Sequence, residues 1–284
     1  MEKEKNNIPY EIKKGDIVTR NSYGKDILFF VKKIIKTKEG NLAILKGCTL
    51  RIEASAPIHD LESVSKDEFR KEMSNLDYKI NKTIGRSIES KKRNKKVTLG
   101  AKEYIYTGKI LHLDGDKKYS EKAIKYYKKI GLNAIVKNIS ENKQPFLIKS
   151  LLERYRPDIL VITGHDGMIR KGERFNDIYN YRNSKYFIEA VKQARVWDKE
   201  KKLVIFAGAC QSFFEAIMLA GANFASSPAR VLIDFIDPLI VAEKVATTDK
   251  YKFIRIDDIE GELRDGRRGI GGIGANGKRN VIFL

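Results

Sequence analysis

The sequence is poor in cysteine and has no long hydrophobic run. Among its 284 residues only Cys48 and Cys210 are cysteines, and they lie far apart. This excludes a disulfide framework and a cysteine-rich zinc cluster, so each thiol needs its own explanation. No apolar stretch approaches the ~20 residues that a membrane span requires. The first residues are polar and of mixed charge, and we expect no secretory signal there.

Acidic residues are also scarce relative to basic ones. The chain has 37 Asp and Glu against 56 Lys and Arg, which gives a net charge of +19. Such an excess favours polyanionic partners, whether nucleic acid or an acidic surface. Most lysines, however, are interspersed with acids, as on a solvated surface, and the one dense basic cluster lies at 91–96. Hydrophobic residues make up 42%, which excludes a disordered chain.

Residues 1–60 are expected to form a small β-barrel domain of the SH3 or Tudor kind. Short β-rich runs, such as 27–31, 34–35 and 42–45, are separated by turn signals at 23–26 and 38–41. Barrels of this type bind peptides or nucleic acids, or simply pack against a neighbour, and the fold alone does not decide among these. Residues 61–100 follow as a helical and basic linker.

Residues 101–284 are predicted to form an α/β domain. Apolar strands alternate with amphipathic helices, which is typical of a parallel sheet with helices on both faces. The expected strands are 109–113, 133–136, 159–163 and 203–207, and the expected helices are 121–130, 145–155, 184–196 and 212–220. In such folds the functional site lies outside the carboxyl ends of the strands.

Two chemically active residues follow neighbouring strands. His165 comes just after the run 159–163, and Cys210 just after 203–207. The sequence 212–215, Ser-Phe-Phe-Glu, has the form of a capping box, so a helix is expected directly after Cys210. A helix N-terminus and a nearby imidazole both favour the thiolate, which indicates an activated nucleophile. Singly, each residue is more often structural, and Cys48 is interpreted as barrel core.

These motifs resemble a known group of enzymes. Gly164-His165 and Gly208-Ala209-Cys210 resemble the His-Gly and Ala-Cys motifs of the caspase-like clan of cysteine peptidases. More closely, the chain resembles the YabG-type family of sporulation-specific cysteine peptidases, through segments spread over most of its length. Besides those two motifs, these are Lys14-Gly15-Asp16-Ile17-Val18, Leu111-His112-Leu113-Asp114-Gly115-Asp116 and Ala225-Ser226-Ser227-Pro228.

The resemblance implies a caspase-like fold and a catalytic dyad of His165 and Cys210. It implies an enzyme without a cofactor that processes spore coat and cortex-associated proteins in the mother-cell cytoplasm, cutting after basic residues. In the wider clan a glycine N–H directly after the histidine helps to form the oxyanion hole. Here Asp166 takes that position and Gly167 follows, so the backbone N–H groups of Asp166, Gly167 and Cys210 are the candidate donors.

Two other functions stay open. A non-enzymatic basic scaffold would bind nucleic acid or spore coat through the barrel and the linker. A Cys–His amidotransferase ranks below both, because no third acidic partner is evident.

The distribution of acids suggests a specificity pocket. Residues 211–240 hold Glu215, Asp234 and Asp237 against one basic residue, Arg230. An acidic pocket floor there would select a cationic side chain, and a planar guanidinium suits a carboxylate better than an ammonium does. We therefore predict cleavage after Arg in preference to Lys, with Asp234, Asp237 and Asp177 as floor candidates. Alternatively, these acids cap a helix or pair with surface lysines.

A peptidase that cuts after basic residues would also find its own linker a substrate. The candidate self-cleavage sites are Arg86 and Arg93, in the polar connector.

Two further motifs are set aside. The glycines of 272–277 match a dinucleotide pattern, and with Lys278 nearly a P-loop, but both patterns need a following helix, and 281–284 is expected to be a strand. His112, Asp114 and Asp116 have metal-ligating side chains, but residues at a strand end usually only shape the turn, and no metal is expected.

Overall fold

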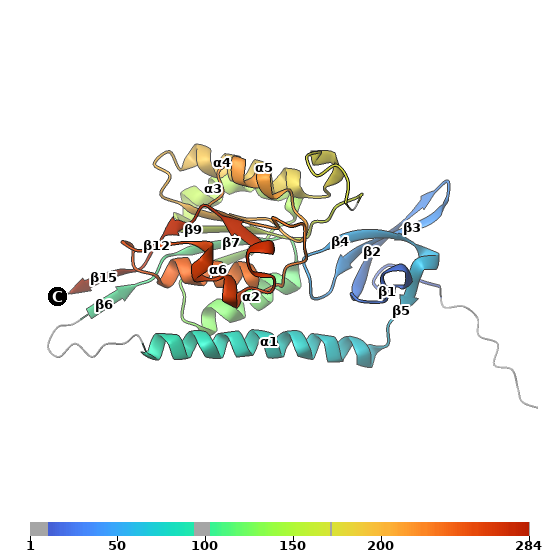
Figure 1. Cartoon of the computed structure of the whole chain (residues 1–284), viewed down its shortest axis with the longest axis horizontal. Helices are drawn as coiled ribbons and strands as arrows, with labels where there is room; N and C mark the ends of the chain where they lie inside the picture. The colour runs from blue at the N-terminus through green and yellow to red at the C-terminus, as the bar shows by residue number, and fades with distance from the viewer. Residues whose placement is uncertain (1–10, 94–102, 171, 284) are drawn as a thin grey trace, which may run out of the picture.

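The computed structural model describes residues 11–93, 103–170 and 172–283. The chain begins with a five-stranded antiparallel sheet and continues through one long helix into an α/β part, as Figure 1 shows. The first sheet has the order β4-β3-β2-β1-β5. Its strands are β1 (Ile17–Arg20), β2 (Phe29–Thr37), β3 (Gly40–Gly47), β4 (Glu53–Pro57) and β5 (Leu61–Ser63).

The predicted strands at 27–31 and 34–35 are one strand. They form β2, whose pairing with β3 shifts by one residue between Val31 and Lys33. A bulge of this kind adds a residue to one strand without ending it, so the intervening lysines did not mark a turn. The fifth strand, β5, lies beyond residue 60 and pairs with β1 at one edge of the sheet.

The connector is helix α1 (Lys66–Arg93), as the spacing of its apolar residues predicted. The Ser65 hydroxyl accepts a hydrogen bond from the Glu68 N–H and so caps the first turn. Leu76, Ile80 and Ile84 are buried along one stripe. In Figure 1 the helix runs along the length of the α/β part, beneath it. Of the basic cluster at 91–96, residues 91–93 end this helix and residues 94–96 lie outside the described residues.

The α/β part is built on a six-stranded sheet of order β13-β11-β10-β9-β7-β8. All neighbouring strands are parallel except β13, which is antiparallel to β11. The strands are β7 (Ile110–Asp114), β8 (Ala134–Asn138), β9 (Ile159–Thr163), β10 (Val204–Ala207), β11 (Phe224–Ser226) and β13 (Ile270–Gly272). A mostly parallel sheet is therefore confirmed.

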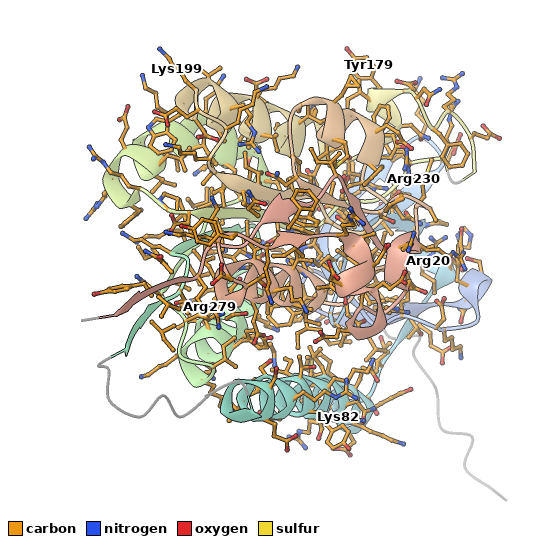
Figure 2. The ribbon with its side chains drawn as sticks, turned by 60° about the vertical axis from the view of Figure 1, so that its left-hand side comes forward. Arg20, Lys82, Tyr179, Lys199, Arg230 and Arg279 are labelled. Atoms are coloured by element: carbon orange, nitrogen blue, oxygen red, sulfur yellow. The ribbon has the colours of Figure 1, made fainter. Side chains whose placement is uncertain are left out.

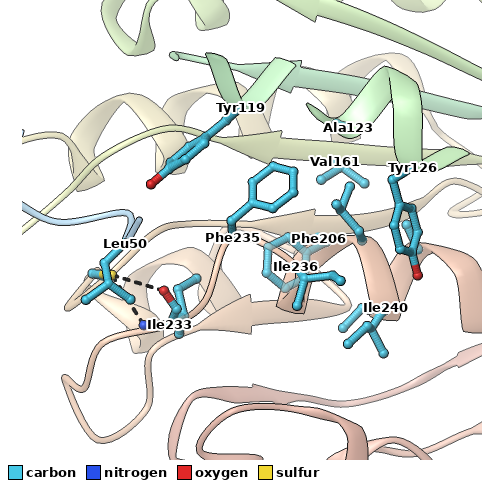
Figure 3. Packing of buried hydrophobic residues seen from close by; sticks show 14 of the residues in the cluster. Leu50, Tyr119, Ala123, Tyr126, Val161, Phe206, Ile233, Phe235, Ile236 and Ile240 are labelled. Carbon is cyan, nitrogen blue, oxygen red and sulfur yellow. Dashed lines mark hydrogen bonds between the residues drawn. The ribbon is translucent and has the colours of Figure 1, made fainter. Parts of the chain in front are cut away.

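Helices cover both faces of this sheet. They are α2 (Lys117–Lys129), α3 (Gln144–Tyr155), α4 (Ser184–Trp197), α5 (Phe214–Leu219) and α6 (Asp237–Thr247). Because side chains alternate along a strand, Leu160 and Ile162 of β9 join the core under α3 and α4, and Val161 joins the core with α2 and α6. Figure 3 shows Val161 and Phe206 packed with Ala123, Tyr126 and Ile240 on this second face.

Short elements complete the fold. Two-stranded sheets pair β12 (Phe253–Ile254) with β14 (Ala275–Asn276), and β6 (Glu103–Tyr106) with β15 (Asn280–Phe283). Gly272 thus ends β13, Gly274 and Gly277 lie between strands, and the next element is the strand β15, as predicted. Single 3-10 turns occur at Asn21–Tyr23, Ile58–Asp60, Glu141–Lys143, Ile178–Asn180, Ile256–Asp258, Glu260–Glu262 and Gly266–Arg268.

The basic excess is spread over the molecule. Figure 2 shows Arg20, Lys82, Lys199 and Arg279 on well-separated parts of the surface. Among the described residues, no helix is long and apolar enough to cross a membrane.

The order of the strands marks one place in the sheet. The chain runs from β7 outward to β8, then returns to the other side of β7 to form β9 and β10. At such a switch point the connections diverge to opposite faces and leave a crevice at the carboxyl ends of the strands. Residues that follow β7, β9 and β10 therefore meet at this crevice.

Candidate active site

His165 and Cys210 lie at the carboxyl ends of adjacent parallel strands, as the sequence predicted. His165 follows β9 and Cys210 follows β10, and these strands pair from Ile159–Val204 to Ile162–Ala207. Both residues are fully buried. The segment that covers them comes from the N-terminal sheet: residues 48–52, which join β3 to β4, run across the crevice.

The His165 ring is held between a backbone carbonyl and an aromatic ring. Its Nε2 lies 3.3 Å from the carbonyl oxygen of Gly47, and its ring stacks on Tyr119 with centroids 5.5 Å apart. A carbonyl can only accept, so this contact assigns the proton to Nε2 and leaves the lone pair on Nδ1. Nδ1 is buried and has no hydrogen-bond partner among the described residues. It is therefore the nitrogen available for proton transfer.

Burial keeps the His165 ring neutral. Loss of solvent, together with the nearby Lys46 ammonium, lowers the pKa of His165 to about 3. The Glu141 carboxylate opposes this shift, and it also accepts a hydrogen bond from the His165 backbone N–H at 2.8 Å. Glu141 comes from the turn before α3 and is itself buried. It holds the loop after β9 in place.

The Cys210 thiol faces the chain near Ile233. The Ile233 N–H donates to Sγ at 3.3 Å, and Sγ lies 3.6 Å from the Ile233 carbonyl oxygen, the two contacts dashed in Figure 3. Burial raises the pKa of Cys210 to about 12, although the Ile233 N–H and the Arg51 guanidinium favour the thiolate. In this arrangement the His165 ring and the Cys210 thiol are both uncharged.

The predicted capping box does not form. Helix α5 begins at Phe214, and no side chain caps it. The Ser212 hydroxyl instead accepts from the Ala209 N–H and donates to Asp166. The expected helix dipole at Cys210 is therefore absent, because the loop after β10 uses the serine to fasten itself to the loop after β9.

Two backbone N–H groups converge on one carbonyl oxygen. Cys210 N and Asp166 N each lie 3.1 Å from the carbonyl oxygen of Arg51. The third predicted donor, the Gly167 N–H, points elsewhere and donates to Asp166 Oδ1 at 2.9 Å. The converging pair thus comes from the two loops that carry His165 and Cys210.

The Asp166 side chain braces these loops. Its carboxylate accepts hydrogen bonds from the Ser212 and Ser184 hydroxyls and from the Asn183 and Gly167 N–H groups. Burial raises the pKa of Asp166 to about 6 in spite of these donors. Asp166 replaces the glycine of the wider clan. Its backbone N–H is directed into the site, and its carboxylate holds the two loops together.

The side chain of Arg51 is fully buried and paired with Asp114. Arg51 Nη1 lies 2.8 Å from Asp114 Oδ2, Nη2 lies 3.5 Å from the Phe235 carbonyl oxygen, and the guanidinium lies over the Tyr119 and Phe235 rings at 4.9 and 5.4 Å. Burial alone would raise the pKa of Asp114, but the Arg51 guanidinium and hydrogen bonds hold it well below its usual range. Asp114 ends β7, at the switch point of the sheet.

The three predicted pocket acids are engaged with other groups. Asp177 caps a 3-10 turn through the Tyr179 N–H, and Asp234 pairs with Arg264 at 3.0 Å. Asp237 begins α6, is buried and accepts from the Asp234 and Arg264 N–H groups. Burial, with the charge of Asp234, raises the pKa of Asp237 to about 7.

The remaining predicted residues are placed as follows. Arg86 is exposed in the middle of α1, and Arg93 is the last residue of that helix, with its side chain outside the described part. Cys48 is buried at the start of the connection between β3 and β4, and burial raises its pKa to about 12. Within the described residues, no group of three His, Cys, Asp or Glu side chains is placed to hold a metal ion.

Sequence reasoning missed Arg51, Gly47 and the role of Asp114 at this site. Arg51 and Gly47 reach it from the N-terminal sheet, and no local pattern in the sequence marks such a contact. The position of Asp114 could have been predicted, because it ends the strand next to β9, and sites in such sheets lie at the carboxyl ends of the strands.

Comparison with known proteins identifies the family of the chain. The family described as YabG peptidase U57 matches residues 13–283. The chain is 39% identical over 278 residues to the sporulation-specific protease YabG of Bacillus subtilis (strain 168), covering 93% of this chain and 94% of that protein. No solved structure matches the chain. The protein described here therefore belongs to the YabG family of peptidases.

Proposed function

We propose that the protein is a cysteine endopeptidase with Cys210 as nucleophile and His165 as its acid–base partner. One observation carries the proposal: the backbone N–H groups of Cys210 and Asp166 converge on a single peptide carbonyl oxygen, that of Arg51. Donors that converge in this way stabilise the oxyanion of a tetrahedral intermediate, which is often the largest single contribution to acyl-transfer catalysis.

The proposed reaction follows from this geometry. His165 Nδ1 takes the thiol proton, and Cys210 Sγ bonds to the carbonyl carbon of the substrate, whose oxygen becomes the oxyanion between the two N–H groups. His165 then gives the proton to the leaving amine, which breaks the peptide bond and leaves a thioester. Water, deprotonated by the same nitrogen, hydrolyses the thioester and regenerates the thiol.

The fold fits this role. A parallel sheet of strand order β8-β7-β9-β10-β11 with an antiparallel edge strand supports the proposed relation to the caspase-like clan. The antiparallel N-terminal sheet is proposed to be a small SH3-like barrel. Its strand β3 ends in Gly47, whose carbonyl orients the catalytic ring, so the N-terminal part belongs to the catalytic machinery.

The proposed substrates are spore coat and cortex-associated proteins, cut after arginine in the cytoplasm of the mother cell. The name of the Bacillus subtilis relative, a sporulation-specific protease, supports the setting. The pairing of Arg51 with Asp114 supports the preference, because it shows that a carboxylate at this crevice holds a guanidinium.

The test is digestion of a mixed peptide library, with cleavage sites mapped by mass spectrometry. Wild-type protein should cut predominantly after Arg. Cys210→Ala should abolish cleavage and leave folding intact, and His165→Ala should lower the rate by orders of magnitude. Cys48→Ala is the matched control for thiol loss and should retain cleavage. Wild-type turnover in Cys210→Ala would refute the mechanism.

A further inference from the structure

Residues 49–53 lie in the crevice in the manner of a bound peptide. Leu50 pairs with Asp234 in antiparallel fashion, and Ile52 pairs with Asp166 in parallel fashion. Between them the Arg51 carbonyl oxygen accepts from Cys210 N and Asp166 N, and the Glu53 N–H donates to the Asp166 carbonyl oxygen at 2.7 Å. The backbone is thus held on both sides of the carbonyl that the Cys210 and Asp166 N–H groups bind.

We propose that this segment is an internal substrate mimic, with Arg51 in the place of the residue after which the enzyme cuts, and that Asp114 is the carboxylate that selects arginine. The inference rests on the proposed function, because it assigns an occupant and a specificity residue to that same site. The carbonyl of Arg51 is the group in the proposed oxyanion hole, so its side chain necessarily marks the primary specificity pocket.

The surroundings of the Arg51 side chain are those of a binding pocket. Arginine is rarely fully buried, because removal of its charge from water is costly unless a partner compensates. Here Asp114 lies at the bottom, the Phe235 carbonyl accepts from the second nitrogen, and the faces of Tyr119 and Phe235 lie along the guanidinium. Carboxylate, carbonyl and aromatic faces together recognise a planar cation.

A hollow opens beside each end of the segment. A hollow of about 520 Å³ opens beside Thr49 and Leu50 and is lined also by Asp234 and Arg264. Another, of about 280 Å³, opens beside Ile52 and Glu53 and is lined also by Gln211. A longer peptide would therefore have room on either side of the position that Arg51 occupies.

Close backbone approach fixes the segment in this position. A Cβ atom on Gly167 would lie 2.2 Å from the carbonyl oxygen of Glu53, so any side chain there would push the segment away. Because the segment fills the crevice and Cys210 is fully buried beneath it, an external substrate can enter only after residues 49–53 move out. The protein is thus closed in the form described.

The first test is the accessibility of the Cys210 thiol. Iodoacetamide labelling of Cys210, measured by peptide mass spectrometry, should be at least tenfold faster in Arg51→Ala than in wild type. Arg195→Ala is the matched control, because it removes another largely buried arginine–aspartate pair, Arg195–Asp198, whose residues line neither hollow. Equal labelling in folded Arg51→Ala and wild type would overturn the mimic.

The second test concerns Asp114. In the Arg51→Ala background, kcat/KM should be at least 100-fold higher for an arginine peptide than for the same peptide with neutral, isosteric citrulline. Adding Asp114→Asn should lower this ratio at least tenfold. The double variant leaves no buried charge unpaired, so it keeps the test possible if Asp114→Asn alone fails to fold. An unchanged ratio would overturn the role of Asp114.

These measurements separate the inference from the proposed function. If no variant cleaves any peptide, the proposed function fails, and thiol labelling still reports whether the segment covers Cys210. If Cys210-dependent cleavage is found and Arg51→Ala changes neither labelling nor kcat/KM, the peptidase stands and the mimic is wrong. Arg51→Lys completes the series, and its labelling rate should lie between those of wild type and Arg51→Ala.

Discussion

The Ser212 hydroxyl donates a hydrogen bond to the Asp166 carboxylate at 2.9 Å, and this contact fastens the loop after β10 to the loop after β9. The two proposed oxyanion donors, Cys210 N and Asp166 N, sit one on each loop. The distance between these two N–H groups therefore depends on the side-chain contact between Ser212 and Asp166.

Ser212→Ala should consequently impair turnover more than binding. We expect kcat for an arginine peptide to fall about tenfold with KM changed less than threefold, since a displaced donor weakens only the transition-state interaction. Ser120→Ala, which removes a different buried hydroxyl that donates to the Asp116 backbone carbonyl, is the control. A purely structural role would lower the unfolding temperature and leave kcat of the folded protein unchanged.

The pH dependence of thiol labelling should distinguish the closed from the open site. In the closed form the pKa of Cys210 is about 12 and that of His165 about 3, so wild-type labelling should stay slow and keep rising up to pH 9. In Arg51→Ala, water reaches the dyad and the pKa of His165 returns toward its ordinary value near 6.5. We therefore expect the labelling rate of Arg51→Ala to show an added inflection between pH 5 and 8. The double variant Arg51→Ala/His165→Ala should lack it.

The sequence contains enough information to predict the two strands that lead to His165 and Cys210. Runs 159–163 and 203–207 are wholly apolar, as strands covered on both faces must be, and they became β9 and β10 with neighbouring ends. The positions of His165 and Cys210 followed from that periodicity and from one topological rule. The helix at 121–130 was predicted to start too late, because Asp116 caps α2 from a position that was interpreted as turn.

The segment that covers His165 and Cys210 could not be predicted from the local sequence pattern. Arg51 stands in a Leu-Arg-Ile stretch with nothing to separate it from an exposed strand residue, and its contact with Cys210 spans most of the chain. The same holds for Gly47, whose carbonyl is chemically ordinary. Such contacts depend on how the N-terminal sheet docks on the crevice, which is a property of the packed molecule rather than of any segment.

Self-cleavage should occur first at the Arg51–Ile52 bond. This bond is already extended beside Cys210, whereas Arg86 lies inside α1 and a helix must open before a peptidase can bind it. Attack on the Arg51 carbonyl carbon, protonation of the Ile52 nitrogen by His165 and hydrolysis by water would give a new N-terminus at Ile52. Mass spectrometry of stored protein should show this end before any cut after Arg86 or Arg93, and none of them in Cys210→Ala.

Asp237 should make stability depend on pH. Its folded pKa of about 7 lies above the unfolded value near 3.9, so the folded state binds the proton more tightly, and this contribution is lost as pH rises through 7. The difference in unfolding free energy between wild type and Asp237→Asn should thus be larger at pH 5 than at pH 7.5, by on the order of 1–3 kcal/mol. Urea unfolding at both pH values measures it, with half-buried Asp177→Asn as control. A difference that stays constant with pH would contradict the assignment.

The preference for arginine over lysine tests which acid forms the pocket floor. In the Arg51→Ala background, kcat/KM should be at least tenfold higher for an arginine peptide than for its lysine counterpart, because a planar guanidinium reaches both Asp114 and the Phe235 carbonyl and an ammonium is a point charge. The charge pattern of the sequence predicts that Asp177→Asn, Asp234→Asn or Asp237→Asn reduces this preference. The contacts of Arg51 predict instead that Asp114→Asn reduces it and that the other three leave it within about twofold, since those acids cap helices or pair with Arg264. Loss of the preference in Asp234→Asn or Asp237→Asn, with Asp114→Asn unaffected, would place the pocket beside α6 and remove Arg51 as its occupant.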